Sequence, residues 1–124
     1  MVTPRARGGQ ATVELVLALP ILMIFILGLA DVGRVMTTSA NLHRAVSAGA
    51  SLGIDHTMTD STIKAVVTGE YPGLPAASVT ITRASDSLIV RASTTVTSFT
   101  PLARWVWASG TITVNAAAVT RVTP

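Results

Sequence analysis

The chain has 124 residues, of which 49% are hydrophobic and 12% are charged, a composition that suits one long apolar segment joined to one small globular head. Nine Lys and Arg residues against six Asp and Glu give a formal charge of +3, but these charges are scattered, so nothing predicts nucleic-acid binding. There is no cysteine, and no spacing matches a metal, phosphate-loop or nucleophile motif. We therefore expect no disulfide, metal, cofactor or catalytic activity.

The first nine residues, MVTPRARGG, are basic and contain no acidic residue. Arg5 and Arg7 precede an apolar stretch, and short segments rich in Lys and Arg stay on the cytoplasmic side of a membrane. This asymmetry predicts a cytoplasmic N-terminus and a head on the outer side of the cytoplasmic membrane.

Leu15 to Ala30 is a run of sixteen residues without a charge, which is typical of a membrane helix. Sixteen helical residues span about 24 Å, less than a hydrocarbon core of about 30 Å. The flanking residues must therefore contribute, and we expect one transmembrane helix over residues 10–34. Pro20 removes one backbone hydrogen bond within it, which membrane helices tolerate, and the sequence leaves open whether the helix is continuous there.

Glu14 lies one residue before this run, where a carboxylate must reach the interface, become protonated or find a cationic partner. One interpretation is a solvated glutamate in the first turns of the helix, which the helix dipole favours. The other is a partner within the membrane. Gly8 and Gly9, just before Gln10, suit either a flexible linker or a processing site.

Beyond the membrane, Asp31 and Arg34 are spaced i, i+3, and we expect them to pair at the outer interface. Apolar or small residues then recur at helical spacing, so the helix should continue to about Leu52. Ala45, Gly49 and Gly53 form a small-residue ladder that lets another backbone approach closely. Its partner is either the head's own sheet or another subunit.

The remaining sequence predicts a short helix and three strands. Thr57-x-x-Asp60 suggests a capping box for a helix over Asp60–Thr68, stopped by Gly69. Alternating patterns predict antiparallel strands over the ranges Val79–Arg83, Leu88–Thr97 and Gly110–Val122. The side chains expected to face the helix are Val79, Ile81, Leu88, Val90, Val96, Ile112 and Val114.

Trp105 and Trp107 lie together between the second and third of these strands. One interpretation is a lid that closes the core of the head. The other is a contact surface for another subunit or for the membrane interface, where tryptophan is enriched.

Several of these features together resemble a known family. Gly9, Gln10 and Glu14 before the apolar run are similar to the processing site of type IV prepilins. The order of Pro20, Ala30-Asp31-Val32-Gly33-Arg34 and the Ala/Gly-rich helical continuation resembles the TadE-like pseudopilins of the tight-adherence pilus. The C-terminal TITVNAAAVTR also resembles the end of that domain. The resemblance implies a pilin-like α+β fold, with a leader over residues 1–9, the transmembrane helix over 10–34 and a head over 35–124.

The resemblance also implies a function. The chain would be a structural minor pilin, cut by a prepilin peptidase after Gly9 and moved from the membrane into or to the tip of an extracellular pilus by an assembly platform. Glu14 would then face the free α-amino group of Gln10 in a neighbouring pilin, which would neutralise its charge and set the register. Two other kinds of protein remain open: a signal-anchored exported binding protein, and a secreted protein cut near Ala30. Major and minor subunits, and any adhesion target, are not distinguished.

Overall fold

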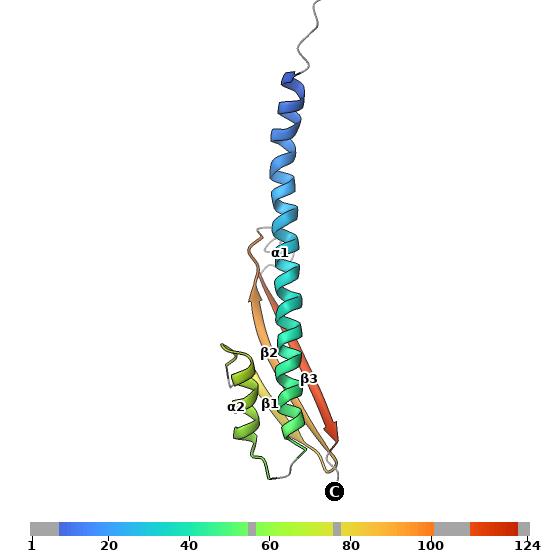
Figure 1. Ribbon diagram of the computed structural model, residues 1–124, viewed down its shortest axis with the longest axis vertical. Coiled ribbons are helices and arrows are strands. Elements are labelled where there is room, and N and C mark those ends of the chain that lie inside the picture. The colour runs from blue at the N-terminus through green and yellow to red at the C-terminus, as the bar shows by residue number, and fades with distance from the viewer. Residues whose placement is uncertain (1–7, 55–56, 76–77, 101–109, 122–124) are drawn as a thin grey trace, which may run out of the picture.

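In a computed structural model of the chain, the described residues are 8–54, 57–75, 78–100 and 110–121. They form a long helix, a short helix and a three-stranded antiparallel sheet, so the predicted α+β fold is confirmed (Figure 1). The elements are α1 (Gly8–Leu52), α2 (Asp60–Glu70), β1 (Val79–Arg83), β2 (Ser87–Thr97) and β3 (Thr111–Arg121).

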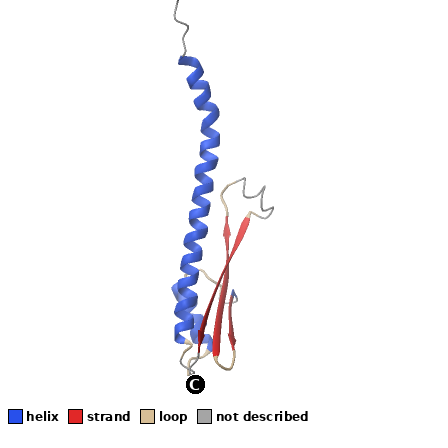
Figure 2. Cartoon of the chain, turned by 90° about the vertical axis from the view of Figure 1, so that its right-hand side faces the viewer, coloured by secondary structure: helices blue, strands red, loops and turns tan. Residues whose placement is uncertain are grey.

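Helix α1 has two halves with different surroundings. Its N-terminal half stands alone, whereas its C-terminal half lies along the sheet and beside α2 (Figures 1 and 2). The helix begins at Gly8, two residues before the predicted start at Gln10, and ends at Leu52 as predicted. It runs without interruption through Pro20, which answers the question that the sequence left open.

The sheet has the order β1-β2-β3, and each strand is antiparallel to its neighbour. Alternate side chains of a strand point to opposite faces, so one face can pack on the helices while the other stays in water. The structure confirms the predicted inward-facing set, with Ile81 and Ile112 half-buried and the others buried. Threonines such as Thr80, Thr95 and Thr113 occupy the exposed face.

The core of the head lies between the helices and the sheet. Leu42 and Val46 of α1, Ile63 and Val67 of α2, and Leu88 of β2 are fully buried there. The C-terminal half of α1 is therefore the central element of the head as well as the continuation of the apolar helix.

The small-residue ladder packs against the chain's own head. A Cβ atom at Gly49 would lie 2.4 Å from Cγ2 of Val67, and one at Gly53 would lie 1.8 Å from Cδ2 of Leu88. Both distances are shorter than carbon atoms can approach, so α2 and β2 come this close only because these positions are glycine. Of the two partners that the sequence allowed for this ladder, the head of the same chain is the one that it packs against.

Helix α2 differs from its prediction at both ends. Its N-cap is Thr59, whose Oγ1 accepts a hydrogen bond from the backbone nitrogen of Thr62, so the predicted capping box at Thr57 is wrong. The helix also continues through Gly69 to Glu70, because a glycine costs a helix only about 1 kcal/mol and does not by itself end it.

Candidate functional site

The residues of the predicted processing site lie in the first turns of α1. Gly9, Gln10 and Glu14 are all exposed, and Nε2 of Gln10 donates a hydrogen bond of 3.5 Å to Oε1 of Glu14. A Cβ atom added at Gly9 would meet nothing within 4 Å. Packing within the chain therefore does not require a glycine at this position, and both faces of the segment are open to another protein.

The apolar run from Leu15 to Ala30 is exposed along nearly its whole length, Pro20 included. Helix α1 is the one described helix that is long and apolar enough to cross a membrane, and within the described residues none of its most apolar window is buried. Large apolar surface left open to water is unfavourable, so this half of α1 needs an apolar environment outside the chain. Its exposed large side chains are Leu15, Val16, Leu17, Leu19, Ile21, Leu22, Met23, Phe25, Ile26, Leu27 and Leu29.

Asp31 follows the apolar run directly and connects it to the head. Its side chain is 8% exposed, and its carboxylate accepts hydrogen bonds from the backbone nitrogens of Phe99 and Thr100, each at 3.0 Å. Oγ1 of Thr100 donates a third, short hydrogen bond to Oδ2. Backbone N–H groups that bind a carboxylate form strong, charge-assisted hydrogen bonds. Asp31 thus holds the segment that follows β2 against α1, and we call this contact the Asp31 clasp.

Arg34 takes part in the same junction but does not pair with Asp31. Its Nη1 donates a 3.3 Å hydrogen bond to the carbonyl oxygen of Thr97, and its guanidinium carbon lies 4.4 Å from the ring centroid of Phe99. The predicted ion pair of Asp31 with Arg34 is therefore wrong. The backbone N–H groups of residues 99 and 100 satisfy the carboxylate instead, which leaves Arg34 to contact the end of β2.

Trp105 and Trp107 lie outside the described residues, so the two interpretations of that segment stay predictions. The described residues on either side of it, Thr100 and Gly110, are both buried. In addition, Ser98 and Gly110 are joined by a backbone hydrogen bond of 3.0 Å.

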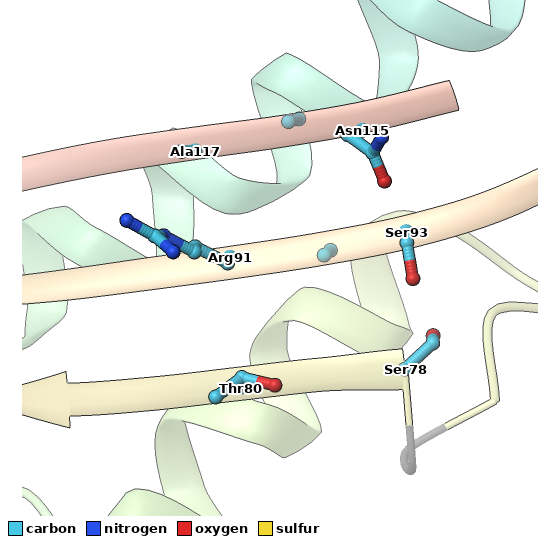
Figure 3. A pocket seen from close by; sticks show the side chains of 8 residues that line it. Ser78, Thr80, Arg91, Ser93, Asn115 and Ala117 are labelled. Atoms are coloured by element: carbon cyan, nitrogen blue, oxygen red, sulfur yellow. The ribbon is translucent and has the colours of Figure 1, made fainter. Parts of the chain in front are cut away.

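The outer face of the sheet has an open hollow of about 490 Å³ with a mixed polar and apolar lining (Figure 3). Arg91 and Ser93 of β2, Asn115 of β3 and Thr80 of β1 line it on the side away from the helices. Ala117 of β3 is paired with Arg91 in the sheet, and its small side chain leaves room for the hollow beside Arg91. This arrangement could bind hydrogen-bonding groups, and it carries one positive charge.

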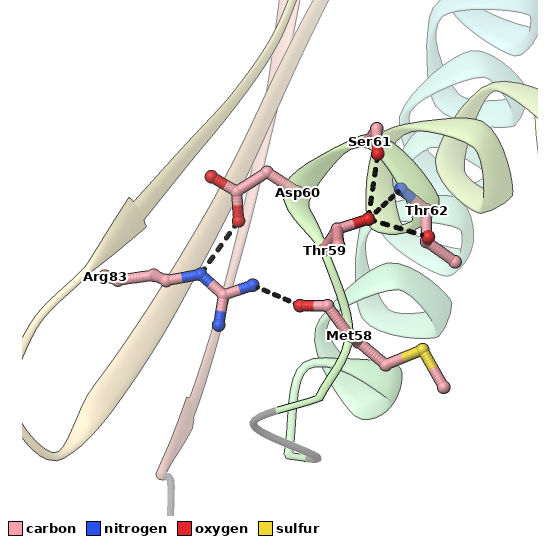
Figure 4. A network of polar contacts seen from close by, with 6 residues as sticks. All are labelled: Met58, Thr59, Asp60, Ser61, Thr62 and Arg83. Atoms are coloured by element: carbon pink, nitrogen blue, oxygen red, sulfur yellow. Dashed lines mark hydrogen bonds and ion pairs between the residues drawn. The ribbon is translucent and has the colours of Figure 1, made fainter.

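A second polar cluster joins the start of α2 to the end of β1 (Figure 4). Nε of Arg83 donates to Oδ1 of Asp60 at 2.8 Å, and Nη2 donates to the carbonyl oxygen of Met58 at 2.7 Å. Both charged side chains are substantially exposed, so the pair adds little to stability. Its two contacts connect β1 to Asp60, the first residue of α2, and to Met58 just before the helix.

Among the described residues, no three His, Asp or Glu side chains come together as metal ligands would. The expectation that the chain is neither a metalloprotein nor an enzyme stays a prediction.

Sequence reasoning missed the partners of Asp31, namely Phe99 and Thr100. They are 68 and 69 residues away from it, and no periodicity links positions so far apart. A weaker signal was present, because an aspartate that ends an apolar run needs several donors, and SFT before Pro101 offers backbone and hydroxyl groups at the end of a strand.

These features define a class of protein: a small α+β head built on the second half of a helix whose first half is apolar and uncovered. Within this architecture, residues 9–51 match the family model described as TadE-like protein. The match covers most of α1 and neither α2 nor the sheet, so the predicted resemblance is confirmed for this segment, while that of the C-terminal strand stays a prediction. No curated protein and no solved structure matches the chain at a significant level.

Proposed function

We propose that the chain is a structural minor pilin or pseudopilin of a tight-adherence pilus. A prepilin peptidase would cut it between Gly9 and Gln10 at the cytoplasmic side, with the head outside, and an assembly platform would then place it in or at the tip of the fibre. The observation that carries this proposal is an uncovered apolar helix that starts with Gly9, Gln10 and Glu14, lies within a TadE-like segment and continues unbroken into the head.

The exposure of the first turns supports the proposal. A peptidase must reach the peptide bond after Gly9, and a neighbouring subunit must reach Glu14, and both residues are accessible. The uncovered apolar surface suits both environments that such a subunit would occupy, first lipid and then the helices of other pilins.

The mature N-terminus tests the proposal directly. In the wild-type chain recovered from membranes, intact mass should place the first residue at Gln10. Retention of Met1 would support a signal-anchored binding protein, and a start near Ala30 would support a secreted protein. Either of these results would contradict the proposal.

Gly9→Arg should block the cut and leave a precursor that is nine residues longer, since a large charged side chain would not fit a peptidase pocket that accepts glycine. A Cβ atom at position 9 meets nothing in the folded chain, so a lost cut would report on the peptidase rather than on misfolding. Gly9→Ala is the matched control with a small side chain. If Gly9→Arg left the mature mass unchanged, processing at this bond would be excluded.

A further inference from the structure

The height of Arg34 along α1 can be compared with the thickness of a bilayer. This comparison rests on the part of the proposed function that places the N-terminal half of α1 in the membrane. Glu14 is the charged residue nearest to the inner end of the apolar run. At the outer end, Arg34 is the first charged residue after Asp31. Twenty residues of helix separate them, about 30 Å, which equals the thickness of a hydrocarbon core. With Glu14 at the inner interface, Arg34 lies at the level of the outer headgroups.

Phe99 lies at the same level as Arg34, although it belongs to the other end of the chain. The Asp31 clasp fixes its backbone nitrogen to α1, and its ring lies against the guanidinium of Arg34. The Phe99 side chain is nevertheless 70% exposed. Within the described residues the ring contacts the guanidinium of Arg34 and keeps most of its surface open, so it is available to an apolar environment at this level of α1.

The chemistry of the pair matches a lipid interface. Aromatic side chains concentrate at the headgroup level, and Arg side chains there direct their charge toward phosphates. The described contacts of Arg34 use one N–H donor, on Thr97, and the face of Phe99, which leaves further donors for an anion. On α1 at this height, Val32 and Met36 are also exposed, so apolar surface continues around the helix next to the pair.

We propose that Phe99 and Arg34 form a contact with the phospholipids of the outer leaflet. The ring of Phe99 enters the boundary between headgroups and acyl chains, and the guanidinium of Arg34 binds a lipid phosphate. The Asp31 clasp is the positioning device, because it brings residue 99 to the helix at this level. The head is thereby docked on the membrane surface rather than held above it, until the subunit leaves the membrane.

The absence of native cysteine allows a direct test on the full chain in nanodiscs that hold one chain each. A polarity-sensitive fluorophore is attached to single cysteines in the variants Phe99→Cys and Thr97→Cys. Thr97→Cys keeps the Phe99 ring, and only the backbone carbonyl of Thr97 binds Arg34. The matched control is Val119→Cys on β3, because Val119 is 66% exposed and lies toward the end of β3 farthest from the apolar half. Ile21→Cys reports on the span itself.

Lipids with a nitroxide on the headgroup should remove roughly half of the emission at positions 97 and 99 and leave position 119 unchanged, because the headgroup level is where the pair is placed. With the probe at position 97, Phe99→Ser or Arg34→Gln should reduce this quenching, and Val119→Ser should not. If the headgroup nitroxide removed the same fraction of the emission at positions 97, 99 and 119, the lipid contact would be overturned.

The remaining arms separate the possible causes. In one alternative outcome, the headgroup nitroxide does not quench the probes at positions 97 and 99 in single-chain discs, and the probes are shielded from water only in discs that hold several chains. That outcome would assign the pair to a contact between subunits and would overturn the lipid contact. Ile21 should be quenched by lipids that carry the nitroxide deep in the acyl chain. If the probe at position 21 were not quenched, the membrane span of the proposed function would be excluded. Quenching at position 21 without quenching at positions 97 and 99 would exclude only the lipid contact of Phe99 and Arg34.

Discussion

Asp31 illustrates how one carboxylate can connect two parts of a chain. It accepts hydrogen bonds from two backbone N–H groups and one hydroxyl of residues 99 and 100, and these donors stabilise its charge more than the nearby guanidinium of Arg34 does. A carboxylate can accept at several positions at once, and an amide in the same place would present an NH2 group to some of these donors. The residue type is therefore set by the donors that surround it.

Asp31→Ala should loosen the junction between β2 and α1. The amide protons of Phe99 and Thr100 lose their acceptor, so their exchange with solvent, measured by NMR on the full chain in detergent micelles, should become about tenfold faster or more. Asp86→Ala, in the exposed turn between β1 and β2, is the control and should leave both amides protected. Unchanged protection in Asp31→Ala would mean that the clasp does not hold this segment.

Glu14 distinguishes an assembling subunit from an anchored one. In an assembled fibre, Glu14→Gln would leave the Gln10 ammonium of a neighbour without its partner, and removing one side of a buried ion pair costs on the order of 3–5 kcal/mol. We therefore expect normal cleavage and membrane insertion but a sharp fall in the amount of the subunit in sheared pilus fractions.

Glu70→Gln is the control for that experiment, since Glu70 is an exposed acid at the end of α2. Incorporation of Glu14→Gln at the level of this control would exclude the assembly role of Glu14. In a protein that is only anchored, the same change removes an unfavourable charge near the membrane, and insertion should improve or stay the same.

At the scale of elements, the two halves of α1 differ in how their apolar surface is distributed around the helix. The first half is apolar on all sides and uncovered, whereas the second half buries one stripe, which includes Leu42 and Val46, and exposes the rest. A helix that is apolar all round suits lipid, and a helix with one apolar stripe suits the surface of a globular core. The two halves are one continuous element, so the orientation of the head follows from the orientation of the span.

The close approach of α1 to the sheet makes Gly53 sensitive to substitution. In Gly53→Ala the new methyl group would overlap Leu88, which is fully buried, and such overpacking costs about 1–3 kcal/mol. The thermal midpoint of the head, followed by protease resistance of the full chain in detergent, should fall by about 5–15 °C.

Gly69→Ala provides the opposite result in the same assay. This glycine lies inside α2, and a Cβ atom there would meet nothing within 4 Å. Alanine should stabilise the helix by about 0.5–1 kcal/mol, so the midpoint should rise by a few degrees. A rise for both variants would show that Leu88 can move aside and that the packing at Gly53 is loose.

For the whole molecule, local patterns were enough to predict the elements. The apolar run and the stripe from Leu42 to Gly49 predicted a helix ending at Leu52, and strict alternation predicted the three strands to within about one residue. Periodicity reports which face of an element is buried, and it does so for each element separately.

The junction could not be predicted in this way, because it depends on where the end of β2 meets α1 in three dimensions. The spacing of Asp31 and Arg34 favoured a local pair, but helix spacing only permits such a contact and is worth a few tenths of a kcal/mol. Three hydrogen bonds from residues 99 and 100 outweigh it. The N-cap of α2 was missed for a different reason, since Thr57 has the acidic Asp60 three positions later and Thr59 has only Thr62 there, yet Thr59 is the residue that caps the helix.

The direction of the strands has a mechanical consequence. β2 and β3 run alongside the second half of α1, and their hydrogen bonds lie across the strands (Figure 2). A tension along the long axis of the molecule that pulls β2 and β3 in opposite directions would load the ladder of eleven residue pairs from Ser87↔Arg121 to Thr97↔Thr111 in shear, and the pairs would resist together. A force applied across the sheet would instead open them one after another. Stretched in this way, this subunit would bear load in its most resistant direction.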